Sequence, residues 1–261
     1  GFAPFCKAPQ KGCIEMAKPL IAGNWKMHGT AAEAVALARQ LVKNEHSCAG
    51  VQLAIFPSTL YLGLVASELS GSAIALGAQN VSEHRPGAFT GEVSADMLKE
   101  TGCDYTLVGH SERRTLFGEV DGAVADKFKA AQRSGLVPIL CVGETLQQRQ
   151  QGLTLDVIAK QINAVKDKVG IENLCRGVIA YEPVWAIGTG EVASPEEAQL
   201  VHRVIRELLG PGGIGTSLLY GGSVKASNAA ELFAEPDIDG GLVGGASLEA
   251  DEFLKIAQLM T

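Results

Sequence analysis

The feature that most restricts how this chain can fold is an alternation of short apolar runs with longer amphipathic stretches, beginning at Pro19. The runs are four to six residues long and are often apolar throughout, as is typical of parallel strands covered on both faces. We therefore predict one strand from each run. The eight predicted strands are Leu20–Asn24, Val51–Phe56, Ile74–Ala78, Tyr105–Val108, Val137–Val142, Gly177–Tyr181, Ser217–Tyr220 and Gly240–Val243.

The amphipathic stretches between the strands have helical periodicity. In Thr30–Lys43, apolar residues recur at intervals of three and four. Ser194 is followed by a proline and then by Glu197, the order expected at a capped helix start. The predicted helices are Thr30–Lys43, Asp121–Ser134, Thr154–Lys168, Pro195–Leu209 and Leu248–Met260.

A strand followed by a helix or loop, eight times over, favours right-handed crossovers between parallel strands. The simplest outcome is an α/β fold in which eight parallel strands close into a single-domain (β/α)8 barrel. The length of 261 residues fits, since such barrels have about 250 residues. An open, doubly wound sheet is the alternative.

Residues 1–15 differ from the rest of the chain. They contain two prolines and two cysteines but no sustained apolar period, and they lack the apolar core of a secretory signal. Met16 is a plausible natural start. We expect residues 1–15 to be an added, tag-like extension and residues 16–261 to be the barrel domain, with a native N-terminal tail as the alternative.

Composition narrows the classes of function. The net charge is −7 and there is no basic cluster, which argues against nucleic acid as a partner. No apolar run approaches the 18 residues that suggest a membrane span. The six cysteines show no zinc-binding spacing, so we predict no metal and a reducing, cytoplasmic location. Cys141, inside a predicted strand, is expected to be a small buried apolar residue.

Glu182 directly follows the predicted strand Gly177–Tyr181 and is the strongest catalytic candidate. Pro183, Trp185 and a glycine-containing segment come next, a composition that suits a mobile apolar flap. Exclusion of water by such a flap would raise the pKa of the glutamate toward the working pH and make it a general base. The alternative is a solvated glutamate in an ordinary loop.

Three further polar residues follow predicted strands. Asn24 and Lys26 have the same parity on the first strand, so both side chains are expected to face the barrel mouth. His110 follows the fourth strand, and Ser111 is expected to cap a short helix there. A helix N-terminus disfavours imidazolium, so His110 is predicted to be neutral and to polarise a carbonyl group. Surface and structural roles are the alternatives for these residues, and Glu112 is either solvated or a support for Lys26.

Paired glycines end the seventh and eighth strands, at Gly221-Gly222 and Gly244-Gly245. Backbone N–H groups in such turns, at the start of a helix, bind phosphate. Phosphate sites after strands 7 and 8 recur in (β/α)8 barrels. Two such turns at successive strand ends therefore predict a phosphate site, against the alternative of glycines chosen only for tight turns.

Taken together, these motifs resemble those of the triosephosphate isomerase family, from about Lys18 to the C-terminus. The resemblance implies a TIM barrel that interconverts dihydroxyacetone phosphate and D-glyceraldehyde 3-phosphate through a cis-enediolate, without cofactor or metal, in glycolysis and gluconeogenesis. The segments that carry it are Gly23–Met27, Gly87–Glu92, Val108–Arg114, Tyr181–Gly190 and the two paired-glycine turns.

The resemblance also implies roles for individual residues. Glu182 would be the base, His110 with Asn24 would polarise the carbonyl, and Lys26 would hold the substrate. The implied phosphate contacts are Gly188, Ser223, Gly244 and Gly245, and the implied lid, from Pro183 to Ala193, includes Trp185 and Ile187, the latter shielding the base.

A homodimer is also implied by the resemblance. The segment Gln79–Glu92 resembles a loop that reaches into a neighbouring subunit, with Thr90 near the partner's site. His28 departs from the family, which often has Asn there, so details of this contact are in doubt while catalysis is little affected.

Two other readings remain at this point. A second phosphate-binding barrel enzyme, such as a Schiff-base aldolase, would need a lysine at a late strand end, where this chain has Glu182 instead. A catalytically silent barrel would be favoured by loss of Glu182, His110 or Lys26, and all three are present.

Overall fold

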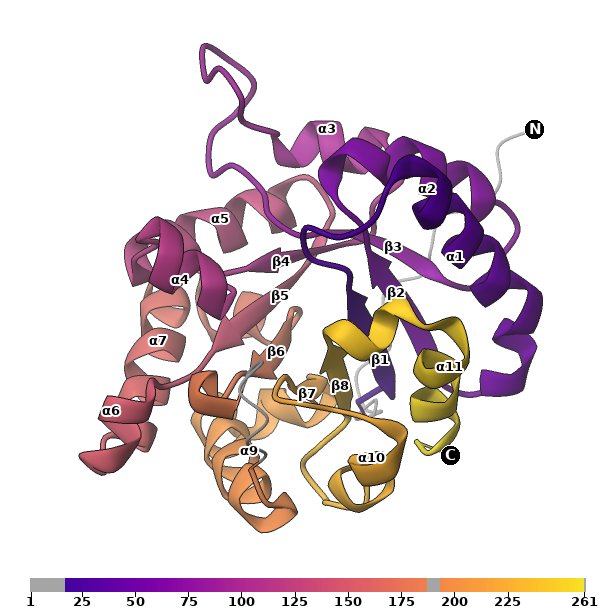
Figure 1. The fold of residues 1–261 in the computed structure, drawn as a ribbon. Coiled ribbons are helices and arrows are strands. Elements are labelled where there is room, and N and C mark those ends of the chain that lie inside the picture. Colours follow the sequence, from indigo (N-terminus) through magenta and orange to yellow (C-terminus); the bar gives the residue numbers. More distant parts are fainter. Residues whose placement is uncertain (1–16, 187–192, 261) are drawn as a thin grey trace.

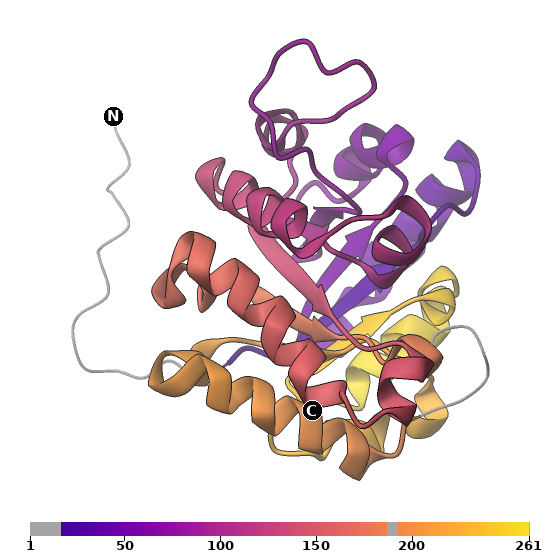
Figure 2. The same ribbon diagram turned by 90° about the vertical axis from the view of Figure 1, so that its left-hand side faces the viewer.

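The fold is a closed barrel of parallel strands in the order β1 to β8, surrounded by helices (Figures 1 and 2). It is described by a computed structural model for residues 17–186 and 193–260. Closure is seen at β1, where Ala22 pairs with Ala54 of β2 and with Leu242 of β8. The strands are β1 Leu20–Asn24, β2 Gln52–Phe56, β3 Ala75–Ala78, β4 Tyr105–Val108, β5 Val137–Val142, β6 Val178–Tyr181, β7 Leu218–Tyr220 and β8 Gly240–Val243.

The predicted (β/α)8 barrel is therefore confirmed, and each predicted strand is present to within one residue at each end. The α-helices are α1 Ala31–Asn44, α2 Leu62–Glu68, α3 Ala95–Glu100, α4 Ser111–Phe117, α5 Asp121–Arg133, α6 Leu146–Gln150, α7 Thr154–Val169, α8 Ile171–Leu174, α9 Pro195–Leu209, α10 Ala226–Phe233 and α11 Ala250–Gln258. The 3-10 helices are η1 Glu45–Cys48, η2 Thr59–Tyr61, η3 Val184–Ala186, η4 Gly210–Gly215 and η5 Gly245–Leu248.

The predicted helix starts are confirmed where a capping residue precedes the helix. Ser194 accepts a hydrogen bond from the N–H of Glu197, and α9 begins at the next residue after Ser194. The last predicted helix, Leu248–Met260, begins later than expected, at Ala250. Its first residue, Leu248, instead ends the 3-10 turn η5, which begins at the second of the paired glycines after β8.

Two apolar clusters hold the barrel together. Alternate strand residues, among them Leu20, Phe56 and Ile139, fill its interior, and Cys141 is buried with them as predicted. The larger cluster packs the outward-facing strand residues against the surrounding helices. The helices thus cover the sheet on all sides and leave the carboxyl ends of the strands to form a site.

One segment stands apart from the barrel. The chain between β3 and α3, which contains Thr90, projects from the body in both views (Figures 1 and 2). Phe89, within this segment, is 43% exposed. None of the described helices is long and apolar enough to cross a membrane.

His202, on α9, gives the barrel a pH-dependent stability. Its ring is fully buried against Tyr181 of β6, with ring centroids 5.8 Å apart, and Nδ1 lies 2.8 Å from the carbonyl oxygen of Ala198. Burial lowers the pKa of His202 to about 4. In the unfolded chain the pKa is about 6.5, so the unfolded state binds more protons between these values, and stability falls as the pH falls through this window.

We therefore expect the free energy of unfolding to drop by about 2 kcal/mol between pH 7 and pH 5 on account of His202. Urea unfolding of the parent and of His202→Gln at both pH values measures this contribution as the difference between the two pH dependences. The variant has a neutral side chain throughout and should show the weaker dependence. Equal pH dependence in both proteins would contradict the assignment.

Candidate active site

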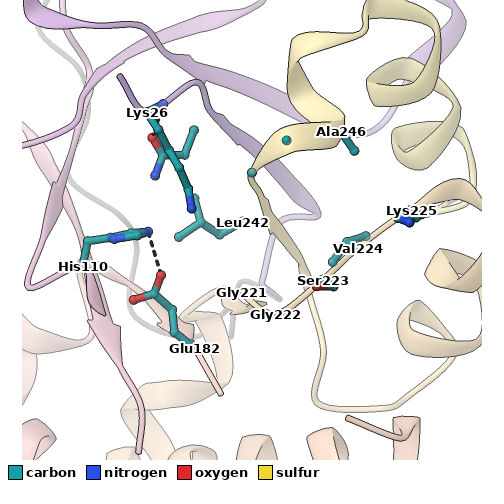
Figure 3. A pocket seen from close by; sticks show the side chains of 13 residues that line it. Lys26, His110, Glu182, Gly221, Gly222, Ser223, Val224, Lys225, Leu242 and Ala246 are labelled. Atoms are coloured by element: carbon teal, nitrogen blue, oxygen red, sulfur yellow. Dashed lines mark hydrogen bonds and ion pairs between the residues drawn. The ribbon is translucent and has the colours of Figure 1, made fainter. Parts of the chain in front are cut away.

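A cavity of about 210 Å³ opens at the carboxyl ends of the strands (Figure 3). It brings together seven of the predicted site residues, which come from the ends of β1, β4, β6, β7 and β8. Its lining consists of Asn24, Lys26, His110, Glu182, Gly221, Gly222, Ser223, Val224, Lys225, Leu242, Gly244, Gly245 and Ala246. Leu242 and Val224 are apolar members of this lining that sequence reasoning missed, since neither carries a chemical signal.

Lys26 has the most unusual backbone of the site. Its φ is +52°, in the left-handed region that costs a non-glycine residue about 1–3 kcal/mol. The buried Asn24 side chain supports this conformation, because its Oδ1 accepts a hydrogen bond of 3.0 Å from the N–H of Lys26. A second support is Gln79, whose side-chain amide donates to the Lys26 carbonyl oxygen at 2.8 Å.

The strained turn directs the Lys26 ammonium across the cavity. Nζ lies 2.5 Å from Oε1 of Glu112, so Glu112 supports the lysine, one of the two alternatives that the sequence left open. A Cβ added at Gly244 would lie 3.5 Å from Cε of Lys26. The positive charge is therefore placed close to the paired-glycine turn of β8.

His110 caps α4 with its own side chain, which corrects the prediction that Ser111 would be the cap. Its Nδ1 accepts a hydrogen bond of 3.2 Å from the N–H of Glu112. A nitrogen that accepts carries no proton, so this hydrogen bond favours the neutral ring with its proton on Nε2. Nε2 faces the cavity and lies 2.9 Å from Oε1 of Glu182 (Figure 3).

The position at a helix N-terminus was expected to lower the pKa of His110, but in the structure this pKa is raised. Burial lowers this pKa, but the charge of the adjacent Glu182 carboxylate raises it above the ordinary value. The Glu182 carboxylate raises the pKa of His110 only while it lies beside the ring. When that carboxylate moves away from the ring, burial and the hydrogen bond accepted at Nδ1 remain, and both favour the neutral imidazole.

Glu182 is almost fully buried, yet its pKa lies below the ordinary value rather than above it. Burial raises the pKa, and the pair with His110 together with the N–H of Ser111 outweighs this effect. The Ser111 hydrogen bond, to Oε2, is 2.8 Å long. The pair with His110 and the N–H of Ser111 thus stabilise the carboxylate, and the raised pKa that the sequence suggested is not found in this arrangement.

Ser223 connects the turn after β7 with the chain that follows Glu182. Its hydroxyl donates a hydrogen bond of 2.8 Å to the carbonyl oxygen of Ala186. Ser223, Gly244 and Gly245 line the same cavity, as the predicted phosphate contacts should. Gly188 and Ile187, the other predicted contact and the predicted shield, lie outside the described residues.

The start of the predicted lid is fixed by a buried carboxylate that sequence reasoning missed. Glu144 follows β5 and is completely buried. Its Oε1 accepts a hydrogen bond of 2.9 Å from the indole N–H of Trp185, and the Tyr181 hydroxyl donates to the same carboxylate at 3.1 Å. The guanidinium of Arg149 lies over the Trp185 ring, 4.2 Å from its centroid. Pro183 is buried directly after Glu182, so the chain is well anchored here.

Thr90 is not part of this cavity. It lines a separate pocket with His84 and Phe89 at the base of the projecting segment. Among the described residues, no group of three or more His, Cys, Asp or Glu is placed to hold a metal ion.

Comparison with known proteins agrees with this geometry. A sequence model of the family described as triosephosphate isomerase matches residues 19–260. The chain is 57% identical to a triosephosphate isomerase from Thiobacillus denitrificans, over 93% of this chain and 98% of the relative. It is 56% identical to one from Dechloromonas aromatica, over 93% and 99% of the two chains. The chain belongs to the triosephosphate isomerase family.

Membership of the triosephosphate isomerase family gives the reaction. The chain is an isomerase that interconverts dihydroxyacetone phosphate and D-glyceraldehyde 3-phosphate, a step of glycolysis and gluconeogenesis. The aldolase and silent-barrel readings of the sequence are thereby set aside.

Gly221 controls where the Glu182 side chain can lie. A Cβ added there would be 2.9 Å from Cγ of Glu182 and 3.1 Å from the carbonyl oxygen of Tyr181. Gly221→Ala must therefore displace the Glu182 side chain. Because a displacement of about 1 Å can cost about 100-fold in rate, we expect kcat to fall about 10- to 100-fold.

Steady-state kinetics of Gly221→Ala, with Gly122→Ala as the matched control, tests this. Gly122 lies in α5 with open space around the added Cβ, so the control should stay within about twofold of the parent. A Gly221→Ala variant as active as the control would show that Glu182 is not confined at this point.

Proposed function

We propose that the isomerisation takes place in this cavity, with Glu182 as the base, His110 as the electrophile and Lys26 as the fixed positive charge. The observation that carries the proposal is the placement of a buried carboxylate and an imidazole, 2.9 Å apart, in one cavity with the lysine. In Figure 3 the three side chains point toward one another.

The first step removes a proton from C1 of dihydroxyacetone phosphate. The Glu182 carboxylate takes this proton, the C–H electron pair forms the C1–C2 double bond, and negative charge collects on O2. The Nε2–H of His110 is the donor available to this oxygen, and Asn24, which is buried beside Lys26, assists. Donors fixed in advance at a developing oxyanion are a large source of rate enhancement.

The second step completes the exchange. Glu182 returns its proton to C2, while the hydroxyl proton of O1 passes to O2 through His110, which leaves an aldehyde at C1. His110 can serve both oxygens because only Nε2 faces the cavity and Nδ1 is committed to the N–H of Glu112. A neutral imidazole can both give and take the proton at that one nitrogen.

To act as the base, Glu182 has to leave its hydrogen-bond donors, Ser111 and His110, and move to the substrate carbon. While Ser111 and His110 hold it, the lowered pKa makes the carboxylate a weak base. Moving away from both donors inside a water-free cavity removes the stabilisation and leaves the burial, which raises the pKa. A lid that begins at Pro183 and includes Trp185 and Ile187 would supply the exclusion of water, and would protect the enediolate from loss of phosphate.

The phosphate group of the substrate would bind at the two paired-glycine turns. Ser223, Gly244 and Gly245 line the cavity on the side where Lys26 reaches the β8 turn, which supports this assignment. Gly188 would add a backbone N–H from the lid. The reaction itself needs no cofactor and no metal, since the protein residues supply base, acid and charge.

The proposal extends to assembly and location. A homodimer is supported by the projecting Gln79–Glu92 segment, which includes Thr90, and by Met27, which is 94% exposed next to His28. Sedimentation equilibrium of the full chain tests it, and a monomer at micromolar concentration would contradict it.

A cytoplasmic location is supported by the buried free thiols of Cys48 and Cys103. The division into a 1–15 extension and a 16–261 domain stays a prediction.

The deciding experiment is conversion of D-glyceraldehyde 3-phosphate to dihydroxyacetone phosphate by the full chain, without added metal or nucleotide. Turnover under these conditions is expected, at a rate that chelator does not change. Binding of a phosphate-bearing substrate analogue without turnover would contradict the catalytic assignment while leaving the ligand site intact.

A further inference from the structure

Gln161, on α7, is a buried polar residue outside the substrate cavity. It is 9% exposed, and it lines a neighbouring cavity of about 450 Å³ together with Gly143 and Glu182. A buried amide costs free energy unless its oxygen and its nitrogen both form hydrogen bonds. The partners of the Gln161 amide therefore show which part of the structure it holds.

Both ends of the Gln161 amide bind one glycine. Oε1 accepts a hydrogen bond of 2.8 Å from the N–H of Gly143, and Nε2 donates one of 3.1 Å to the carbonyl oxygen of the same residue. Gly143 directly follows β5. Within residues 17–186 and 193–260, no backbone group forms a hydrogen bond with Gly143. The side chain thus takes the place of a neighbouring strand at this point.

The sheet itself leaves Gly143 without a strand partner. On one side, β4 pairs with β5 only as far as Leu140. On the other side, the carbonyl oxygens of Val142 and Glu144 accept hydrogen bonds from the chain that follows β6. Hydrogen bonding along a strand alternates between its two neighbours, so Gly143 faces the side that β4 has left. Gln161 supplies both missing partners there.

Gly143 in turn lies directly against the backbone of Glu182. A Cβ added at Gly143 would be 1.7 Å from the carbonyl oxygen of Glu182 and 3.3 Å from its Cα. In addition, the N–H of Glu182 donates a hydrogen bond of 2.7 Å to the carbonyl oxygen of Val142, the residue before Gly143. A shift of Gly143 must therefore shift the backbone that carries the Glu182 carboxylate.

We propose that Gln161 is a positioning residue for the proton transfer. Its amide fixes Gly143, and Gly143 fixes the backbone from which the Glu182 side chain extends. The inference rests on the proposed role of Glu182 as the base, since Gln161 does not line the substrate cavity and acts through Glu182. Because a displacement of about 1 Å can cost about 100-fold in rate, loss of the amide lowers kcat far more than substrate affinity.

Gln161→Met tests this by removing both hydrogen bonds while keeping an unbranched side chain. We expect kcat to fall about tenfold or more, with the affinity for a phosphate-bearing substrate analogue within about twofold of the parent. Exchange of the C1 hydrogen of dihydroxyacetone phosphate with deuterated water should fall with kcat. Gln132→Met is the matched control, because the Gln132 amide on α5 also bonds a backbone carbonyl, that of Asn173, but lines neither cavity.

Gln161→Glu separates positioning from a loss of folding. A protonated carboxyl group can accept from the Gly143 N–H and donate to the Gly143 carbonyl oxygen, as the amide does, whereas the ionised group can only accept. Burial raises the pKa of such a group. The charged side chains around the same cavity are Arg114, Glu119, Asp121, Lys160 and Glu182.

Relative to the parent at the same pH, kcat of Gln161→Glu should lie within about threefold at about pH 5.5. It should fall about tenfold or more by about pH 9, as the introduced carboxyl group ionises. Gln132→Glu should show no such dependence. A purely structural role would change the amount of folded protein, which circular dichroism measures, and would leave kcat per folded molecule unchanged at both pH values.

Two results would overturn the proposal: a kcat of Gln161→Met equal to that of Gln132→Met, or a kcat ratio of Gln161→Glu to the parent that does not change with pH. A double-mutant cycle with Glu182→Gln gives a further test. The effect of Gln161→Met should largely disappear in that background, and a loss that persists in full would show that the amide acts through another group. Parent-like turnover of Glu182→Gln alone would instead overturn the role of the base, and this inference with it.

Discussion

Replacement of Glu182 by Gln is expected to lower kcat by about 10³-fold or more, with a much smaller change in KM. General base catalysis contributes up to about 10⁴-fold, and the amide cannot accept the proton from C1. The substitution is nearly isosteric, and the side-chain oxygen can still accept the hydrogen bond that the N–H of Ser111 now donates. The loss should therefore appear in the chemical step, with the fold and the phosphate site intact.

Steady-state kinetics in both directions, together with exchange of the C1 hydrogen of dihydroxyacetone phosphate with deuterated water, measures this effect. Exchange should fall in parallel with turnover, since both require removal of the same proton. Glu68→Gln is the matched control, because it removes a carboxylate that pairs with Arg39 on the surface and should leave both rates unchanged. Turnover within tenfold of the parent would show that another group is the base.

The same variant tests the electrostatic link between Glu182 and His110. The Glu182 charge raises the pKa of His110, so its removal should lower this pKa, as followed by NMR of the imidazole. A lower value would agree with the neutral imidazole that the mechanism requires once the base has moved to the substrate. A pKa that stays the same or rises would mean that the hydrogen bond at Nδ1 and burial do not control the ring.

The barrel was predictable from the sequence because its strands are buried on both faces. Runs such as Val137–Val142 are apolar throughout, and this run ends at Gly143, so its limits were clear. The short helices were not predictable in this way, apart from α4, which was expected near Ser111. Helices α2, Leu62–Glu68, and α6, Leu146–Gln150, contain too few turns for a 3.6-residue period to emerge, and packing stabilises them where propensity does not.

The predicted residues of the site came from one rule, that reactive groups in a (β/α)8 barrel follow strands. The rule selected Glu182, His110 and Lys26, and the structure places all three in one cavity. The rule could not predict the contacts among these three residues. The hydrogen bond from Ser111 to Glu182 joins positions 71 apart, and this contact lowers the pKa that burial alone would raise.

Glu144 was not predicted, because its role also depends on contacts between positions far apart in the sequence. It also follows a strand, but one of its hydrogen-bond donors is Trp185, 41 residues further along the chain at the start of the predicted lid. A buried carboxylate of this kind is recognisable only when its donors are known. Local sequence therefore predicted the polar residues that line the cavity better than the buried carboxylate that holds Trp185.

Replacement of Lys26 by Met is expected to lower kcat/KM by about 10³-fold or more. The substitution removes the positive charge that reaches the paired-glycine turn after β8, in a partly buried site where one preorganised donor is worth about 10²- to 10³-fold in rate. It also weakens binding of the substrate dianion. Kinetics and the affinity for a phosphate-bearing analogue measure the two effects, and Lys43→Met, on the exposed face of α1, is the matched control.

Part of this loss should come from Glu112 rather than from the missing ammonium. In Lys26→Met the Glu112 carboxylate loses its partner at 2.5 Å and remains 3.6 Å from Nδ1 of His110, where its charge repels the phosphate and favours imidazolium. The double variant Lys26→Met/Glu112→Gln should therefore bind the analogue several-fold more tightly than Lys26→Met. Equal affinities of the double variant and of Lys26→Met would show that Lys26 contributes only through its direct contact with the substrate. Unchanged affinity and turnover in the single variant would remove Lys26 from the site.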